Sequence, residues 1–162
     1  MQQMEEIYQA YAKLVYRYLL SLTADADLAE ELTQETFFQA FRSIGRYDES
    51  CKIYTWLCAI AKNVWHSYLR KHPAAEHLED QVIAVDSAEK KVLDEEERTM
   101  LLKSVHALPE PYREVIYLRI YAELSFREIG DVIGKSENFA RVSFYRGKER
   151  LKKMLSEEKK YE

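Results

Sequence analysis

Apolar residues recur every three or four positions through the first 72 residues, which is the spacing of one face of an α-helix. Three amphipathic helices are predicted from this pattern: one over residues 5–22, a second that begins after the break at 23–25 and runs to about 44, and a third over 53–70. Asp25 or Asp27 can cap the second helix with a side-chain oxygen, and Gly45 is expected to end it. A polar loop over 45–52 then leads into the third helix, and Pro73 closes the unit.

The second half of the chain carries start and stop signals for four further helices. They are predicted over residues 88–107, 112–121, 125–133 and 137–156. Ser125 followed by Glu128 is the signature of a capping box, and Ser136 can cap the last helix after a glycine-containing turn. Residues 73–87 lack a sustained period and begin acidic, so we interpret them as a linker.

The scarcity of turn residues decides the fold class. Only four glycines and three prolines occur among 162 residues, too few for several β-hairpins. We therefore predict an all-α protein with two small helical domains, over 1–72 and 88–162, joined by the acidic linker 73–87.

Composition also limits where the protein works and what it binds. No apolar run is long enough to span a bilayer and no signal-peptide core is present, which predicts a cytoplasmic protein without membrane insertion. Two cysteines and four scattered histidines complete neither a disulfide framework nor a zinc pattern. We expect no metal and no cofactor. We also expect no enzymatic activity, because the chain has no glycine-rich phosphate loop, nucleophile elbow or HExxH motif.

The last two predicted helices form the pattern of a helix-turn-helix, in which a short capped helix, a tight turn and a longer basic helix follow one another. The chain has a net charge of −4, yet residues 135–153 hold seven Lys and Arg against two Glu. Gly130 is small enough to let the two helices cross closely. One stripe of the last helix is apolar and faces inward: Ala140, Phe144, Gly147 and Leu151.

The opposite stripe of that helix has the chemistry of DNA reading. It consists of Asn138, Arg141, Val142 and Tyr145. Asn and Arg can read base edges in the major groove, and Val and Tyr can contact thymine methyl groups. Arg146 and Lys148 lie on its flanks, where cations suit phosphates. The alternative is a solvated basic helix that only closes a small bundle.

Two helices of the first unit carry further candidate surfaces. The second exposes an acidic face with an aromatic beside it, comprising Glu30, Glu31, Gln34, Glu35 and Phe38. Such a face either aids solubility or docks on a basic protein surface. The third places Thr55, Trp56, Lys62, Asn63 and Arg70 opposite its core stripe. Aromatic rings among cations suit stacking on unpaired bases. The alternative is that the rings pack inside, which we favour for Tyr68 and leave open for Trp56.

Three segments of the chain, in this order, resemble a known family. They are DLAEELTQETFFQAF at 27–41, YTWLCAIAKNVWHSYLRK at 54–71, and 107–155, which opens ALPEPYREV and contains the helix-turn-helix. Together they resemble an extracytoplasmic-function (ECF) sigma factor of the sigma-70 family of bacterial RNA polymerase. The resemblance implies a transcription initiation factor with core RNA polymerase and promoter DNA as partners. It also implies an anti-sigma factor, of a kind that can be anchored in a membrane.

The resemblance assigns roles to particular positions. It implies that Glu31, Gln34 and Glu35 dock on the clamp helices of the β′ subunit, and that the second domain contacts the β flap; from its place beside them we expect Phe38 to take part. It implies that Trp56 and Asn63 help to open the −10 element, with the loop 45–53 capturing a flipped base; we expect Lys62 and Arg70 on the same helix to contribute. It implies that Arg141, Val142 and Tyr145 face the −35 major groove and that Arg146 can bind phosphate; the pattern of the last helix adds Asn138 and Lys148. The chain departs from the family over 138–143, where NFARVS replaces the usual GTVKSR.

Two other classes of protein fit parts of the pattern. One is a conventional helix-turn-helix transcriptional regulator that acts as a dimer. The other is a helical adaptor or inhibitor whose last helix is only structural. Stable binding to core polymerase together with promoter-specific initiation distinguishes the sigma factor from both.

Overall fold

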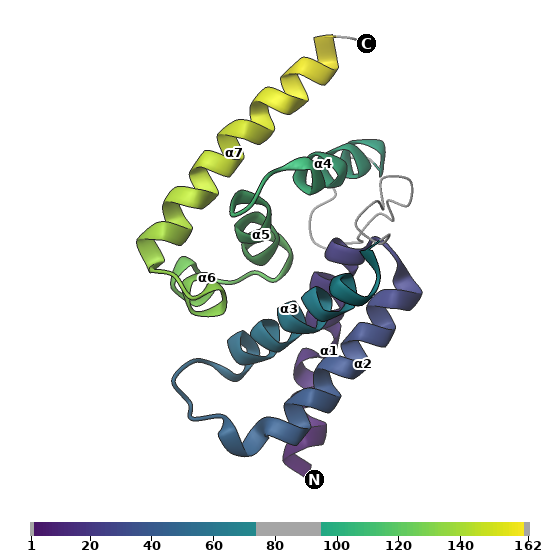
Figure 1. The fold of residues 1–162 in the computed structure, drawn as a ribbon, viewed down its shortest axis with the longest axis vertical. Helices are drawn as coiled ribbons and strands as arrows, with labels where there is room; N and C mark the ends of the chain where they lie inside the picture. Colours follow the sequence, from purple (N-terminus) through teal and green to yellow (C-terminus); the bar gives the residue numbers. More distant parts are fainter. Residues whose placement is uncertain (1, 74–94, 161–162) are drawn as a thin grey trace.

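The computed structural model describes residues 2–73 and 95–160, and every regular element in that part of the chain is helical. The N-terminal domain consists of α1 (Gln2–Thr23), α2 (Ala26–Ser43), the short 3-10 turn η1 (Ile44–Arg46) and α3 (Ile53–Lys71). The C-terminal domain consists of α4 (Glu95–Ala107), α5 (Tyr112–Ile116), the π-helical turn η3 (Tyr117–Tyr121), α6 (Phe126–Ile133) and α7 (Glu137–Lys160). The predicted all-α fold with a helix-turn-helix is confirmed (Figure 1).

The N-terminal helices pack through the apolar stripes that their periodicity predicts. Tyr18 and Leu19 of α1 and Leu57 of α3 are at most 1% exposed, and each such side chain contributes about 1.5–3 kcal/mol through burial. Asp25 rather than Asp27 caps α2, because its carboxylate accepts hydrogen bonds from the backbone N–H groups of Asp27 and Leu28 at 3.1 and 3.2 Å.

The second helix was expected to end at Gly45, but this glycine lies inside the turn that follows the helix. α2 ends at Ser43 and the chain continues into η1, which contains Gly45. The left-handed cap occurs instead at Gly134, whose φ of 72° follows the end of α6. A single 3-10 turn tightens the end of α2 without any positive φ, so a glycine is not required there.

The C-terminal domain differs from the sequence prediction at two places. The predicted helix over 88–107 is not one of them: it is described from Glu95 to Ala107, and residues 88–94 and nearly all of the predicted linker lie outside the described residues. The predicted helix over 112–121 changes to π-helical geometry at Tyr117. The last helix continues to Lys160, four residues beyond the predicted end at 156.

The two domains touch through their helices and share buried surface. Figure 1 shows α5 and α6 between α7 and the N-terminal helices, and contacts join α3 to α6 and α1 to η3. Buried apolar side chains of both domains form one continuous cluster. α3 therefore has a face toward the C-terminal domain as well as one toward α1 and α2.

Candidate nucleic-acid and protein interfaces

The helix-turn-helix is held by hydrogen bonds that its own sequence dictates. The Ser125 hydroxyl accepts from the Glu128 N–H at 3.1 Å, and the Glu128 carboxylate accepts from the Ser125 N–H at 3.0 Å, which completes the predicted capping box. The Ser136 hydroxyl accepts from the Phe139 N–H at 3.0 Å and caps α7 as predicted. Gly130 allows a close approach, but to the turn rather than to a crossing helix: a Cβ there would lie 2.6 Å from the Lys135 carbonyl oxygen.

The two faces of α7 are those that the pattern predicts. Ala140, Gly147 and Leu151 are buried, and Phe144 is half-buried. The opposite stripe, consisting of Asn138, Arg141, Val142 and Tyr145, is exposed along its whole length, as are Arg146 and Lys148. The side chain of Tyr145 is 54% exposed although its ring is large. An exposed polar and aromatic stripe on the second helix of a helix-turn-helix suits insertion into a major groove.

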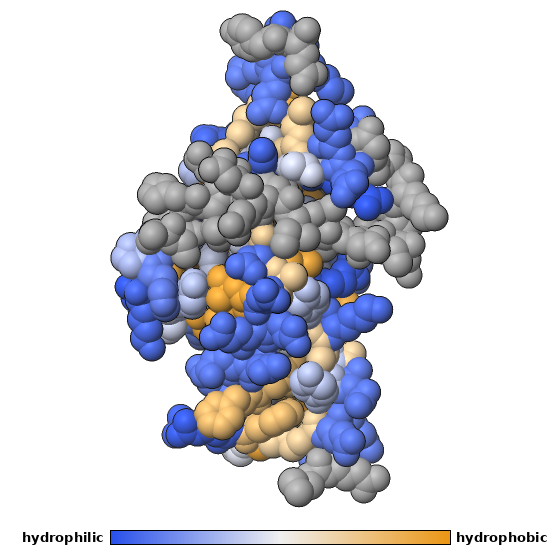
Figure 2. Space-filling view, turned by 90° about the vertical axis from the view of Figure 1, so that its right-hand side faces the viewer, coloured by the Kyte–Doolittle hydropathy of each residue, from blue (hydrophilic) through white to orange (hydrophobic). Residues whose placement is uncertain are grey.

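The acidic face of α2 is exposed as expected. Glu31, Gln34 and Glu35 lie on the solvent side of the helix, and Phe38 is 56% exposed. The Arg42 guanidinium carbon lies 5.6 Å from the Phe38 ring centroid. Figure 2 shows hydrophobic surface at the end of the molecule where α1 begins and α2 ends. An apolar side chain beside carboxylates is the composition of a protein-docking surface rather than of a purely solubilising one.

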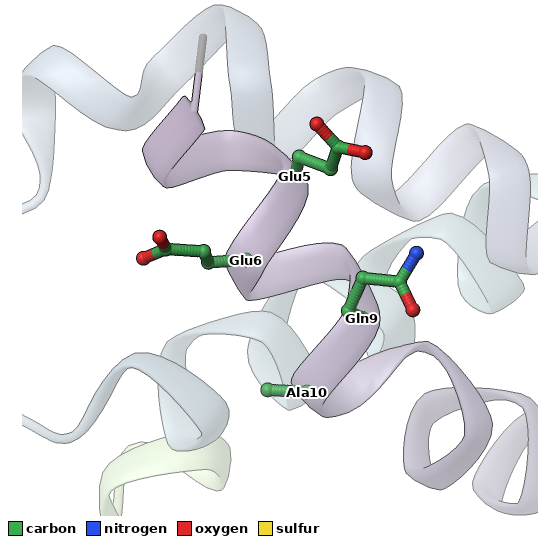
Figure 3. A pocket seen from close by; sticks show the side chains of 4 residues that line it. All are labelled: Glu5, Glu6, Gln9 and Ala10. Carbon is green, nitrogen blue, oxygen red and sulfur yellow. The ribbon is translucent and has the colours of Figure 1, made fainter.

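A shallow hollow on α1 lies near this end of the molecule. It is lined by Glu5, Glu6, Gln9 and Ala10, and Figure 3 shows the two carboxylates pointing to different sides of the helix. Since its polar groups come from one helix and do not converge, the hollow offers no site for a small ligand. Within the described ranges, no three His, Cys, Asp or Glu side chains gather as the ligands of a metal ion would.

The third helix differs from the sequence expectation, because part of its outward face meets the C-terminal domain. Thr55, expected to face solvent, is only 1% exposed, and its hydroxyl donates to the Glu128 carboxylate at 2.8 Å. The Tyr54 hydroxyl donates to the Ala122 carbonyl oxygen at 2.7 Å. The Lys62 ammonium lies 3.4 Å from a carboxylate oxygen of Glu114 in α5. The prediction of a fully solvent-facing stripe is therefore wrong for Thr55.

The other candidate side chains of α3 keep access to solvent. Asn63 and Arg70 are exposed. Trp56 is half-buried and its ring centroid lies 5.2 Å from that of Tyr47 in the loop between η1 and α3. Tyr68, which we expected to pack inside, is half-buried and stacks on Trp65. Asn63, Arg70 and part of the Trp56 ring thus remain available to a ligand on this helix.

Two interdomain carboxylates are residues that the sequence pattern did not single out as functional. Glu128 was assigned only a capping role, and although partial burial acts to raise its pKa, hydrogen bonds from Ser125 and Thr55 hold that pKa below its ordinary value. Glu114 was not assigned a role at all. No local signal could reveal their partners, because Thr55 lies 73 positions from Glu128 in the sequence.

These features place the chain in the class of two-domain helical proteins with a helix-turn-helix. Its second helix, α7, exposes a polar and aromatic stripe, and α2 of the other domain exposes acidic side chains beside Phe38. Comparison with known proteins agrees with this class. The family model of Sigma-70 region 2 matches residues 7–74, and that of Sigma-70, region 4 matches residues 98–151. The chain belongs to the ECF sigma factors of the sigma-70 family.

Individual relatives cover nearly the whole chain. It is 39% identical over 159 residues to the ECF RNA polymerase sigma factor SigM of Bacillus subtilis, spanning 94% of each chain. It is 32% identical over 155 residues to the RNA polymerase sigma factor CarQ of Myxococcus xanthus, spanning 94% of this chain and 89% of the relative.

A solved structure has the same fold. The sigma factor RpoE from Bartonella quintana, in complex with the anti-sigma factor NepR, superposes with a TM-score of 0.77 at 21% identity, over 96% of this chain and 98% of that one. None of the helices described here is long and apolar enough to cross a membrane.

Proposed function

We propose that this sigma factor binds core RNA polymerase and directs it to promoters by recognising −35 and −10 elements. The observation that carries the proposal is the free stripe Asn138–Arg141–Val142–Tyr145 on a helix whose other face is buried. The chain supplies sequence readout to an enzyme that lacks it, and we infer that it catalyses no reaction itself. Such a protein works in the cytoplasm, where promoter DNA is.

We propose the domain division 1–72, 73–87 and 88–162, with the first part acting on polymerase and the −10 element and the last on the −35 element. The ranges of the two family models, 7–74 and 98–151, support this division because each lies almost wholly within one part.

Reading of the −35 element would take place on α7. The Arg141 guanidinium can donate two hydrogen bonds to a guanine, and Val142 and Tyr145 offer apolar contact to thymine methyl groups. Asn138, at the start of the helix, can bond a base edge or a phosphate. Arg146 and Lys148 are exposed on the flanks of the stripe and would bind phosphates, which adds affinity without sequence preference.

Opening of the −10 element would take place on α3 and the loop before it. Trp56 can stack on an unpaired base, Asn63 can bond a base edge, and Lys62 and Arg70 can hold the backbone. Unstacking costs a few kcal/mol per base, and capture of the extruded base by a ring offsets that cost. The loop 45–53 stands next to Trp56, since Tyr47 packs against its ring, and we propose that it receives the extruded base.

Docking on polymerase would use the acidic face of α2. Glu31, Gln34 and Glu35 form a surface whose charge complements basic helices, and Phe38 adds the apolar contact that fixes register. We propose the clamp helices of the β′ subunit as the partner of this face, and the β flap as the partner of the C-terminal domain. The sigma factor RpoE is bound by an anti-sigma factor in its structure, and we propose a membrane-anchored anti-sigma factor as a partner of this chain too.

The deciding experiment reconstitutes the purified chain with core polymerase and measures transcripts from a library of −35 and −10 sequences. We expect stable core binding and initiation restricted to a subset of sequences. The double substitution Gln34→Ala with Glu35→Lys should weaken core binding at unchanged helicity, because both side chains are exposed and hold no core contact. Glu123→Lys, an exposed acidic position outside α2, is the matched control.

The two other classes of protein predict different results. A dimeric helix-turn-helix regulator would bind promoter DNA without core polymerase and would start no transcripts. A helical adaptor would bind neither DNA element. Core affinity unchanged by the double substitution would remove the docking assignment while leaving the family assignment standing.

A further inference from the structure

We propose that Phe126 is a positioning residue for promoter reading, whose ring holds Arg141 and Tyr145 of α7 in the orientation that meets the base pairs. The inference rests on the proposed reading of the −35 element by α7. Phe126 itself belongs to α6 and lies outside the reading stripe. Its role would be to support two of the four stripe residues from a neighbouring helix.

The ring of Phe126 is the centre of a small cluster between three elements. The Arg141 guanidinium carbon lies 5.4 Å from its centroid, and the Arg119 guanidinium carbon of η3 lies 4.4 Å from it. The ring centroid of Tyr145 lies 6.2 Å away and that of Phe144 5.5 Å away. One aromatic ring therefore contacts an arginine and a tyrosine of the reading stripe together.

The ring itself is held in place from its own helix and from η3. Phe126 directly follows Ser125, the N-cap residue of α6, so the capping box fixes the backbone from which the ring projects. Arg119 donates a hydrogen bond to the Leu124 carbonyl oxygen at 3.0 Å, which keeps its guanidinium beside the ring. A side chain anchored in this way can restrict the motion of whatever it contacts.

Arg141 gains most from such restriction. Its guanidinium is exposed and meets the Glu137 carboxylate at 3.1 Å as well as the Phe126 ring. An exposed arginine otherwise occupies many rotamers, and the entropy of ordering it is lost on binding. Contact with both an aromatic ring and a carboxylate leaves the guanidinium few orientations, so its planar donor fork is ordered before DNA arrives.

Phe126 packs at the edge of the hydrophobic core rather than inside it. The buried residues of α6 are Ile129, Gly130 and Val132, whereas Phe126 is half-buried and lies against the core. Removal of the ring is therefore expected to leave α6 folded, because the capping box and the buried face remain. The loss falls instead on Arg141 and Tyr145.

The test measures the −35 preference of holoenzymes that carry Phe126→Leu, Phe126→Met, Phe126→Tyr or Arg141→Ala. Preference at each −35 position is the ratio of transcription from the original promoter to transcription from a promoter substituted at that position. Thermal unfolding checks that each variant is folded. Phe126→Leu should lower preference at the position that Arg141→Ala affects by about two- to fivefold, which is what one exposed cation–π contact supplies. Phe126→Tyr keeps the ring and should restore the preference. Phe126→Met removes the ring but leaves a long, flexible apolar side chain, so it should show the same loss of preference and provides the test if Phe126→Leu unfolds.

The double variant Phe126→Leu with Arg141→Ala separates positioning from packing. At the position that Arg141 reads, it should show the same preference as Arg141→Ala alone, because the ring acts there through the arginine. Two results would refute the positioning role while the reading by α7 stands. One is that Phe126→Leu and Phe126→Met reduce transcription from every promoter equally. The other is that Phe126→Tyr fails to retain the −35 preference. If Arg141→Ala changes no −35 preference, the proposed reading by α7 fails and the role of Phe126 fails with it.

Discussion

The Thr55 hydroxyl of α3 donates a hydrogen bond of 2.8 Å to the carboxylate of Glu128, the same residue that closes the capping box of α6. One glutamate thus stabilises the helix-turn-helix and links the two domains. Lys62, a proposed −10 contact, is paired across the same interface with Glu114 at 3.4 Å. In this arrangement part of the α3 surface is engaged by the C-terminal domain.

Glu114→Gln should therefore release Lys62 for DNA. Both side chains of this pair are largely buried, at 18% and 22% exposure, and the glutamate charge offsets that of the lysine. We expect the free chain to bind a single-stranded −10 oligonucleotide roughly two- to fivefold more tightly after the substitution, the effect of removing one ion pair. Fluorescence anisotropy measures this affinity. Glu110→Gln is the control, because Glu110 pairs with Arg113 at 2.8 Å within the C-terminal domain. Equal gains in both variants would mean that only net charge matters.

Trp56→Ala should slow promoter opening more than it weakens the closed complex. The ring is half-buried against Tyr47, so part of its surface is free to stack on an extruded base. Permanganate reactivity of the −10 thymines reports opening, and filter binding at low temperature reports the closed complex. The opening rate of Trp56→Phe, which keeps a smaller ring, should lie between those of Trp56→Ala and the unsubstituted protein. Normal opening, or a large fall in thermal stability, would identify Trp56 as a packing residue.

Arg141→Ala and Lys148→Ala should differ in kind. Arg141 lies on the reading stripe and can make a paired contact to guanine, worth roughly 1–3 kcal/mol of discrimination. Lys148 is exposed off that stripe, where a point charge meets phosphate and carries no sequence information. Its loss should weaken binding to all promoters alike, and it should reduce the slope of log affinity against log salt concentration by about one unit. Transcription from −35 variants at several salt concentrations checks both. If Arg141→Ala reduces transcription from all −35 variants equally, α7 does not place Arg141 against the bases of the −35 element.

Gly130→Ala should destabilise the C-terminal domain. A Cβ at this position would lie 2.6 Å from the Lys135 carbonyl oxygen and 3.1 Å from Ser136 backbone atoms, so the turn would have to shift. Overpacking of this kind costs about 1–3 kcal/mol. Urea unfolding measures the change. Gly45→Ala is the matched control, since nothing lies within 4 Å of its added Cβ and it has no positive φ, so it should cost nothing. Equal stability of the two variants would contradict the close approach at the turn.

Stability should fall below pH 6.5 because of His106. Burial first, and Arg113 second, lower the pKa of its imidazole to about 4 from an ordinary 6.5. As pH falls from 6.5 toward 4, the unfolded chain takes up a proton that the folded chain does not. The free energy of unfolding then decreases by at most about 1.4 kcal/mol per pH unit from this residue. Urea unfolding at pH 7 and pH 5 should show that the free energy of unfolding falls less in His106→Gln than in the unsubstituted protein. His66→Gln, at an exposed position, should show the same fall in the free energy of unfolding as the unsubstituted protein. An equal fall in His106→Gln would contradict the role given to His106.

Local signals predicted most of the helices and the faces of α7. Asp25, Ser125 and Ser136 each bond to backbone N–H groups two or three residues away, so their caps can be identified from neighbouring residues alone. The stripe from Asn138 to Tyr145 follows from a period of 3.6 residues. Gly45 shows the limit of such signals, because a glycine after a helix is compatible with a left-handed cap and also with the 3-10 turn that forms.

The amino-acid sequence alone was enough to predict an all-α chain, a capped helix-turn-helix, an exposed polar stripe on its second helix and an exposed acidic face on α2, because each depends on residues a few positions apart. Packing of the folded chain was needed to show that Thr55 is buried against Glu128 and that the Phe126 ring contacts both Arg119 and Arg141. Thr55 and Glu128 are 73 positions apart, and nothing in the spacing of either helix specifies which face of α3 meets α6. That choice depends on how the apolar surfaces of two domains fit together, which is a property of the whole packed chain.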